Sequence, residues 1–247
     1  MADRTILITG ASSGIGAALA RVYAAPGISL ILWGRDQTRL AETAAACRAK
    51  GAACATGVFD IRDHDAHLSH LKAAGAVDLA IFNAGVGGTV ASDRMSEDPV
   101  RARATAEVNF VAPVTGTSFM AGEMAKRGKG CIVLIGSISE SYPLPMAPTY
   151  AATKAGLRMF AEALSLRMAK FGVRITLVSP GFIDTPMSQS LNEPRPFLIG
   201  ADQAARAIRR GVAAGKRVIV VPWQFAVIRF ITDLLPRGVV RALLSRR

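Results

Sequence analysis

Residues 5–16 read Thr5-Ile6-Leu7-Ile8-Thr9-Gly10-Ala11-Ser12-Ser13-Gly14-Ile15-Gly16, and this stretch decides the fold. Its apolar start predicts a buried strand, and the alanine-rich stretch at 15–25 predicts a helix. Glycines between the two permit a tight turn and the close approach of backbone N–H groups to a phosphate. The N-terminus of the helix adds unpaired N–H groups and a positive dipole end. We therefore interpret the turn as a phosphate-binding loop; a purely structural turn is the alternative.

Apolar runs alternate with helical stretches along the rest of the chain. The runs lie at 28–33, 54–59, 78–82, 131–135, 173–178 and 218–221. Because they are apolar throughout, we expect strands that are covered on both faces. Seven such strands predict an α/β fold, a doubly wound Rossmann-like domain with a seven-stranded parallel sheet flanked by helices. No linker or repeat divides the chain, so we expect a single domain over residues 1–247.

Composition narrows the function classes. Hydrophobic residues make up 51% of the 247, which fits a folded globular protein. No apolar run is long enough to span a bilayer, and MADRTILITG does not resemble a secretory signal. Cys47, Cys54 and Cys131 lack C-x-x-C spacing, so we expect a reducing cytoplasm and neither disulfides nor a zinc site. The net charge of +12 favours an anionic partner, such as a phosphorylated cofactor, an acidic substrate, a membrane or nucleic acid.

The glycine spacing adds a family resemblance. G-x-x-x-G-x-G differs from the G-x-G-x-x-G of longer dehydrogenases, and T-G-A-S-S-G-I-G resembles the cofactor turn of classical short-chain dehydrogenases/reductases. Further landmarks follow in order over residues 5–187: Asp60, Asn83-Ala84-Gly85 and Pro180-Gly181. The resemblance implies that a dinucleotide contacts Gly10, Ser12, Ser13, Gly14, Ile15, Gly16, Asp60, Ile61, Asn83, Ala84, Gly85, Tyr150, Lys154, Pro180, Gly181, Ile183 and Thr185.

The end of the second apolar run bears on which dinucleotide binds. An acidic residue there would bind the ribose hydroxyl of NAD, whereas this chain has Gly34 followed by Arg35. An arginine can pair with a 2′-phosphate, so we favour NADP(H) over NAD(H). Asp36 could pair with Arg35, but as a helix N-cap it would point elsewhere. Ser13 departs from NADP-preferring relatives, many of which have Arg or Lys at this position.

Tyr150 and Lys154 are the candidates for acid–base chemistry. Their spacing of four residues places them on one face of a helix. A free tyrosine has a pKa of about 10, and a nearby ammonium favours the phenolate and lowers that pKa. Taken alone, the pair is also a common pattern of helix surfaces, so its context decides.

Ser137 is the candidate that polarises a carbonyl. It follows the run at 131–135, and ligands bind at the C-terminal ends of parallel strands. Its hydroxyl can donate to a substrate carbonyl oxygen. Ser139 and Ser141 are alternatives, and the family's placement of a serine before the tyrosine selects Ser137.

The resemblance implies a role for each of these residues. Tyr150 protonates the carbonyl oxygen in reduction, Lys154 lowers its pKa and binds the nicotinamide ribose, and the cofactor supplies the hydride. Asn109 matches an asparagine that helps to hold a proton-relay water, although a buried asparagine that bonds backbone is an equal alternative. The Ile183 backbone and the Thr185 hydroxyl are expected to fix the nicotinamide amide. Phe82 replaces a second asparagine that is usual before Asn83.

Two C-terminal segments receive separate interpretations. Residues 186–200 lie where the family places its substrate lid, and their apolar side chains predict a hydrophobic carbonyl substrate. Residues 223–247 combine the apolar stretch Trp223–Leu235 with Arg237, Arg241, Arg246 and Arg247. We prefer the interpretation in which this tail covers the substrate pocket or a partner subunit. The alternative is an interfacial helix on anionic lipid.

The leading hypothesis is an NADP(H)-dependent oxidoreductase that interconverts a carbonyl and an alcohol, assembled as a homodimer or homotetramer. A non-catalytic NADP(H)-binding sensor or scaffold is the alternative, since fold alone does not fix function. We expect no nucleic-acid partner, because the basic residues are dispersed. His64, His67 and His70 share a predicted helix face, which we interpret as solvated rather than as a metal site.

Overall fold

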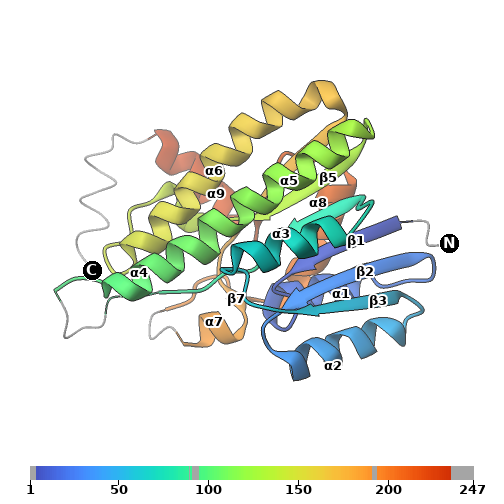
Figure 1. Cartoon of the computed structure of the whole chain (residues 1–247). Helices are drawn as coiled ribbons and strands as arrows, with labels where there is room; N and C mark the ends of the chain where they lie inside the picture. The colour runs from blue at the N-terminus through green and yellow to red at the C-terminus, as the bar shows by residue number, and fades with distance from the viewer. Residues whose placement is uncertain (1–3, 89, 91–94, 191–193, 235–247) are drawn as a thin grey trace.

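A computed structural model describes residues 4–88, 90, 95–190 and 194–234. A seven-stranded parallel sheet lies at its centre (Figure 1), with the strand order β3-β2-β1-β4-β5-β6-β9. The strands are β1 (Arg4–Thr9), β2 (Ile28–Gly34), β3 (Ala53–Val58), β4 (Leu79–Phe82), β5 (Gly130–Ile135), β6 (Val173–Pro180) and β9 (Val218–Val221). The strands β7 (Ile183–Asp184) and β8 (Ile199–Gly200) pair separately. The predicted fold class is confirmed.

Helices connect the strands and cover both faces of the sheet (Figure 1). The α-helices are α1 (Gly14–Tyr23), α2 (Gln37–Arg48), α3 (His64–Ala73), α4 (Pro99–Ala106), α5 (Ala112–Lys126), α6 (Pro148–Met168), α7 (Pro186–Gln189), α8 (Ala201–Ala213) and α9 (Gln224–Leu234). A π-helical turn η1 (Glu107–Val111) joins α4 to α5, and 3₁₀ turns η2 (Ile138–Ser141) and η3 (Ala169–Phe171) flank α6. Within the described ranges, no helix has the length and hydropathy needed to cross a membrane.

The core has two halves because successive strand residues point to opposite faces. Ile6 and Ile8 of β1 pack on the side of α1, α2 and α8. Leu7, between them, packs on the side of α3, α5 and α6. The unbroken apolar runs therefore supply both halves of the core, as expected for a parallel sheet between two helical layers.

Strand β3 differs from this pattern. It lies at the edge of the sheet and pairs with β2. Most of its residues are exposed, so the expectation that every strand is covered on both faces is wrong for this one. The physical reason is its edge position, where helices that pack over the inner strands leave part of the outermost strand open.

The histidine face of α3 is also not the solvated surface that we expected. His67 is fully buried beside Trp33 and Phe59, with ring-centroid distances of 6.1 and 6.3 Å. Burial lowers the pKa of His67 to about 4 and so keeps it neutral. His70 stacks on Phe59 at 4.2 Å. Among the described residues, no group of three histidine, cysteine or acidic side chains is placed to hold a metal.

Phe82 stands where an asparagine is usual before Asn83, and its larger ring faces a glycine of helix α5. Phe82 is buried at the end of β4, and Gly116 of α5 lies against its ring. A Cβ at position 116 would overlap that ring, so helix and strand approach closely only because this residue is glycine.

Gly116→Ala should therefore lower the free energy of unfolding by roughly 1–3 kcal/mol, because the added methyl overpacks the core. Gly122, on the same helix, has no atom within 4 Å of an added Cβ. Gly122→Ala should instead raise stability by about 0.5–1 kcal/mol through helix propensity. Urea unfolding of both variants checks this pair, and equal effects in the two would contradict the packing account.

Candidate active site

The turn after β1 is built on glycines in conformations that other residues avoid. Gly10 and Gly14 have φ angles of 66° and 54°, in the left-handed region. At Gly16 the constraint is space, since a Cβ would overlap the Gly10 carbonyl oxygen and the Asn83 side chain. All three glycines of the motif are therefore needed for the local structure.

Asn83 ties this turn to the loop after β4. Its Nδ2 donates to the carbonyl oxygens of Thr9 and Gly10, both at 3.1 Å. The backbone N–H groups of Asn83 and Ala84 donate to the Thr9 hydroxyl at 3.0 Å. Gly85 follows, where an added Cβ would lie 3.9 Å from the Lys154 Nζ. The Asn83-Ala84-Gly85 segment thus links the glycine-rich turn to the side of the site where Lys154 lies.

The N-terminus of α1 can receive an anion. Ser13 is its N-cap but makes no side-chain capping bond, and the first turn contains no acidic residue. By contrast, α2 and α3 are capped by Asp36 and Asp63. A cavity of about 360 Å³ opens beside this helix end, and its lining includes Ser12, Ser13, Gly14, Arg39 and Thr185. Unpaired N–H groups, a positive dipole end and free space fit the phosphates of a dinucleotide.

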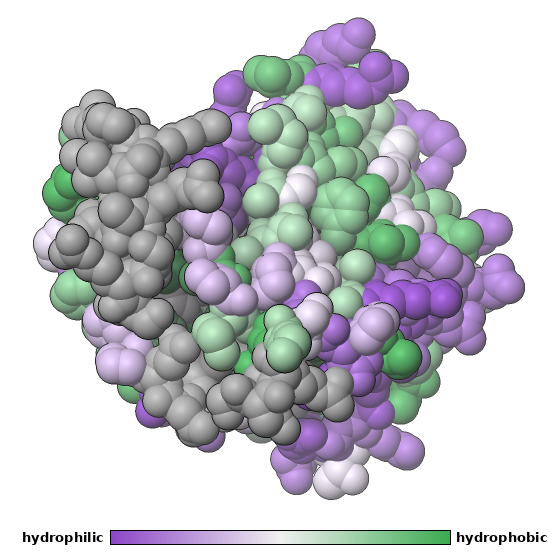
Figure 2. All heavy atoms as spheres, turned by 90° about the vertical axis from the view of Figure 1, so that its left-hand side faces the viewer, coloured by the Kyte–Doolittle hydropathy of each residue, from purple (hydrophilic) through white to green (hydrophobic). Residues whose placement is uncertain are grey.

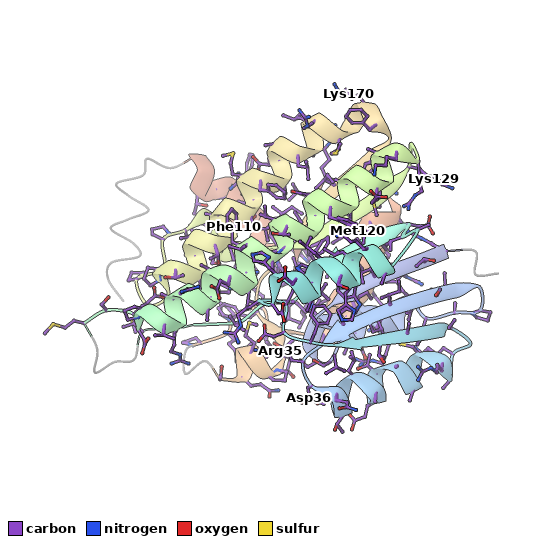
Figure 3. All side chains as sticks on the ribbon, in the orientation of Figure 1. Arg35, Asp36, Phe110, Met120, Lys129 and Lys170 are labelled. Atoms are coloured by element: carbon purple, nitrogen blue, oxygen red, sulfur yellow. The ribbon has the colours of Figure 1, made fainter. Side chains whose placement is uncertain are left out.

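Arg35 directly follows β2, at the end of the sheet where the parallel strands have their C-termini, as Figure 3 shows. Asp36 does not pair with it, because the Asp36 carboxylate caps α2 at the Arg39 N–H and binds the Arg39 side chain at 2.6 Å. This confirms the expected N-cap. Arg35 instead lies 3.8 Å from Asp60, with 60% of its side chain exposed.

Asp60 and Ile61 occupy the loop after β3. The Asp60 carboxylate binds the Arg62 guanidinium at 2.7 Å, and these bonds lower the pKa of Asp60. Ile61 is buried in a small cluster with Val108 and Ala112, against which Ala84 also packs. The loop is therefore held against the segment after β4, and the expected dinucleotide contacts of Asp60 and Ile61 stay a prediction.

Ser137, Tyr150 and Lys154 meet at the C-terminal edge of the sheet. Ser137 lies close enough to Tyr150 for its hydroxyl to lower the pKa of the phenol. The Lys154 Nζ lies 5.6 Å from the centre of the Tyr150 ring and donates to the Ile135 carbonyl oxygen at 2.9 Å. Two successive turns of α6 and the end of β5 thus bring the three predicted residues together.

Burial determines the pKa values of this group. Desolvation raises the pKa of Tyr150, and the nearby Ser137 hydroxyl opposes this rise. Desolvation also lowers the pKa of Lys154 to about 8. Burial is thus the largest effect on both groups in this structure, and the role of Lys154 in lowering the tyrosine pKa stays a prediction. A buried phenol that keeps its proton at neutral pH is suited to act as an acid.

Asn109 lies in the π-helical turn η1 and is buried. Its Oδ1 accepts from the Val86 N–H and its Nδ2 donates to the Val86 carbonyl oxygen, each at 2.8 Å. The bonding to backbone that we weighed as the alternative is thus what its side chain does. The proton-relay role stays a prediction.

The segment after β6 crosses the site and reaches the glycine-rich turn. Gly181 follows Pro180 and packs against Phe225 of α9. The Ile183 carbonyl accepts from Ser188 Oγ at 2.6 Å, and the Thr185 hydroxyl caps α7. An added Cβ at Gly14 would come within 3.1 Å of the Thr185 methyl group, so this segment touches the turn directly.

The predicted lid and tail are described in part. Residues 191–193 and 235–247 lie outside the described residues, including Leu235, Arg237, Arg241, Arg246 and Arg247. In the lid, Met187 packs beside Gly87, and Phe197 meets Phe225 at 5.6 Å between ring centroids. Helix α9 buries Phe225 but exposes Trp223 (just before it), Val227, Phe230 and Ile231.

Sequence reasoning missed four charged residues near the site. Glu140 is buried and pairs with Arg229 of α9. Glu97 accepts from the Thr149 N–H and hydroxyl, next to Tyr150. Arg39 lines the cavity at the phosphate end. The S-x-x-E pattern from Ser137 to Glu140 is a capping-box signal that could have identified Glu140; the pairing with Arg229 joins positions 89 apart and has no local signal.

Comparison with known proteins places this geometry in a family. The family model described as short chain dehydrogenase matches residues 4–196. An uncharacterized oxidoreductase of Myxococcus xanthus is 32% identical over 250 residues, covering 100% of this chain and 98% of that protein.

Solved structures agree with this assignment. A short-chain dehydrogenase from Sphingobium yanoikuyae in complex with NADPH has 26% identity and a TM-score of 0.84, covering 98% of this chain and 95% of that one. An actinorhodin polyketide ketoreductase variant with NADPH has 25% identity and a TM-score of 0.77, covering 89% and 95%. With its glycine-rich turn and its Ser137, Tyr150 and Lys154 side chains in one site, the chain belongs to the short-chain dehydrogenase family and is an NAD(P)-dependent oxidoreductase.

Proposed function

We propose that this protein is an NADP(H)-dependent oxidoreductase that interconverts an apolar ketone or aldehyde and its alcohol, with Tyr150 as the acid and base. The contact of Tyr150 with Ser137, beside Lys154, carries this proposal. A bound nicotinamide supplies or accepts the hydride. The rest of the chemistry is proton transfer and polarisation by the protein.

Each side chain has a part that fits its surroundings. The Ser137 Oγ accepts from the Ser139 N–H at 3.2 Å, which leaves its own hydrogen free to donate. It can donate to the substrate carbonyl oxygen while Tyr150 gives that oxygen its proton; in oxidation Tyr150 takes the proton back. Lys154, whose Nζ donates to the Ile135 carbonyl oxygen, would bind the ribose hydroxyls. Asn109 would support the proton relay through the loop that it holds.

The NADP(H) preference rests on Arg35 and its neighbours. Gly34 leaves no acidic side chain at the end of β2, and Arg35 is exposed. Its partner Asp60 lies 3.8 Å away, and an exposed pair of this kind contributes about 0–1 kcal/mol. A 2′-phosphate can displace it, since charge-assisted hydrogen bonds to phosphate are stronger. The NADPH complexes of the two structural neighbours point the same way.

The apolar substrate class rests on the surroundings of the site. Met146, Met187, Phe197 and Leu198 are large apolar residues with more than a third of their surface exposed. Figure 2 shows the end of the molecule that is on the left in Figure 1, where apolar residues form a band beside the grey atoms. Side chains of this kind would shield a hydrophobic carbonyl from water.

We also propose a cytoplasmic homo-oligomer, a homodimer or homotetramer, without a nucleic-acid partner. Met159 and Leu166 of α6 are about 70% exposed, at 67% and 71%, and offer an apolar helix face for a second copy. The exposed side of α9 leaves peripheral contact with anionic lipid as a second interpretation. Sedimentation equilibrium and vesicle flotation test the two; a monomer that floats with anionic vesicles would favour the membrane.

Tyr150→Phe should lower kcat for carbonyl reduction by roughly 10²–10⁴-fold, the usual contribution of a general acid. NADPH binding, followed by fluorescence, should persist. Reduction is assayed with a panel of carbonyl substrates that runs from small polar aldehydes to the apolar 1-phenyl-1,2-propanedione. Tyr23→Phe is the matched control, because Tyr23 is buried in α1 and its hydroxyl has no hydrogen-bond partner among the described residues.

The pH dependence follows from the raised pKa of Tyr150. Reduction needs the protonated phenol, so its rate should stay level through neutral pH and fall as alkaline pH removes the proton. Oxidation needs the phenolate and should rise over the same range. Loss of reduction on the acid side would contradict this role, and a Tyr150→Phe enzyme as fast as the wild type would favour the sensor or scaffold alternative.

Arg35→Gln should raise KM for NADPH by roughly 10- to 100-fold, the equivalent of one hydrogen bond to a charged group, and leave KM for NADH nearly unchanged. Lys126→Gln on α5 removes the same charge far from the turn and controls for the general loss of positive potential. Equal losses with both cofactors would show that Arg35 does not read the 2′-phosphate.

A further inference from the structure

Glu140 is a buried carboxylate directly beside the proposed catalytic serine, and the chemistry described above does not use it. Its side chain is 0% exposed. It ends a capping box in which the Ser139 N–H donates to Ser137 Oγ and the Ser137 N–H donates to Glu140 Oε2, the latter at a long 3.4 Å. The serine and the carboxylate therefore hold one turn between them.

Two further elements converge on the same carboxylate. Ser179 of β6 donates to Glu140 Oε1 at 2.7 Å, and Arg229 of α9 reaches it at 3.1 Å. The Arg229 side chain is 19% exposed, so its head group is largely out of water. The turn that carries Ser137 is thus joined to the sheet and to the C-terminal helix through one side chain.

The backbone is shaped around this carboxylate. An added Cβ at Gly136 would come within 2.6 Å of Glu140 Oε2, so the position before the serine has room for glycine alone. The Gly136 N–H donates to the Val178 carbonyl at 2.7 Å. A close fit on both sides of Ser137 leaves its hydroxyl little freedom to turn away.

Helix α9 is docked on this turn at more than one point. Besides the Arg229 pair, the Tyr142 and Thr232 hydroxyls are hydrogen-bonded at 2.5 Å, and Phe225 covers Gly181. In Figure 1, α9 lies partly behind α6, the helix that carries Tyr150 and Lys154. The contacting residues of α9, Phe225, Arg229 and Thr232, follow one another at spacings of four and three residues, so one face of the helix makes all of these contacts.

We propose that Glu140 and Arg229 are positioning residues: their buried ion pair couples the docking of α9 to the orientation of the Ser137 hydroxyl, so the C-terminal helix sets the efficiency of carbonyl polarisation. This rests on the proposed function for its kinetic consequence, but the coupling of α9 to the turn stands independently of it. Loss of Arg229 leaves a buried carboxylate with less compensation, and the turn relaxes to rehydrate it.

Charged groups from every neighbouring element act on Glu140. Arg229 of α9 and Arg158 of α6 lower its pKa, Ser179 and the Ser137 N–H do so by hydrogen bonding, and burial, the largest effect, raises it. In return, the Glu140 charge raises the pKa values of Tyr150 and Lys154. Removing this charge should therefore move the alkaline limb of the pH–rate profile to lower pH, a readout that a merely structural role would not change.

The first experiment needs no substrate. Hydrogen exchange of the peptide 137–147 is followed by mass spectrometry in Arg229→Met, in Arg229→Lys and in Glu123→Gln, which removes one partner of an exposed ion pair on α5. Exchange in Arg229→Met should accelerate about 10-fold or more while α2 stays protected as in the wild type. Arg229→Lys should lie between, and Glu123→Gln should match the wild type. Unchanged exchange in Arg229→Met would overturn the proposal.

The second experiment uses 1-phenyl-1,2-propanedione and NADPH. Arg229→Met should lower kcat by about 10- to 100-fold with KM for NADPH unchanged, since a misplacement of about 1 Å has effects of that size. Glu140→Gln keeps the shape of the side chain and should shift the alkaline limb to lower pH. A wild-type kcat in Arg229→Met, or an unshifted limb in Glu140→Gln, would overturn the kinetic part. Silence of the wild type would count against the proposed substrate class and leave the exchange result to decide the coupling.

Discussion

The absence of a side chain at Gly16 is the constraint on which the rest of the site depends. The Gly10 carbonyl oxygen and the Asn83 Nδ2 occupy the space that a Cβ would need. Asn83 can therefore bond both strand-end carbonyls of the turn, which places Gly85 beside Asn109 and Lys154. Lys154 in turn reaches Ile135, two residues before the serine. A steric condition in the first turn is thus transmitted through hydrogen bonds to Lys154 and the end of β5.

Burying ionisable side chains in the site lowers the stability of the fold, and the same burial shifts the pKa values of those side chains. Lys154 and Glu140 are buried and ionisable, and burial pushes the pKa of each toward the neutral form. Their hydrogen bonds to Ile135, Ser179 and Arg229 offset part of that cost. With a pKa of about 8, Lys154 can exchange a proton closer to neutral pH than a solvated lysine can. Burial of apolar side chains in the two halves of the core offsets the stability lost at the site.

The sequence predicts local and repetitive features well and distant pairings poorly. The runs around Ile8 and Val133 predict strands because a short, continuous apolar stretch is typical of a strand that is buried on both faces. His67 was misplaced, since its burial depends on Trp33 and Phe59 from two other strand ends. Glu140 carries a local capping pattern, but nothing local shows that Arg229 will meet it. The backbone of the site follows from short patterns, and its electrostatics follows from tertiary contacts.

The ion pairs at the phosphate end of the site are exposed, whereas the ion pair beside Ser137 is buried. Arg35, Arg39 and Arg21 each lie within 4 Å of an aspartate, yet these pairs are exposed, and exposed pairs contribute about 0–1 kcal/mol. A phosphate can replace such a partner because hydrogen bonds to a charged group contribute roughly 1.5–3 kcal/mol. The Arg229 pair is enclosed, so no ligand displaces it without leaving a charge uncompensated. On this proposal the same residue type would bind an exchangeable phosphate at one end of the site and hold the backbone at the other, and burial separates the two uses.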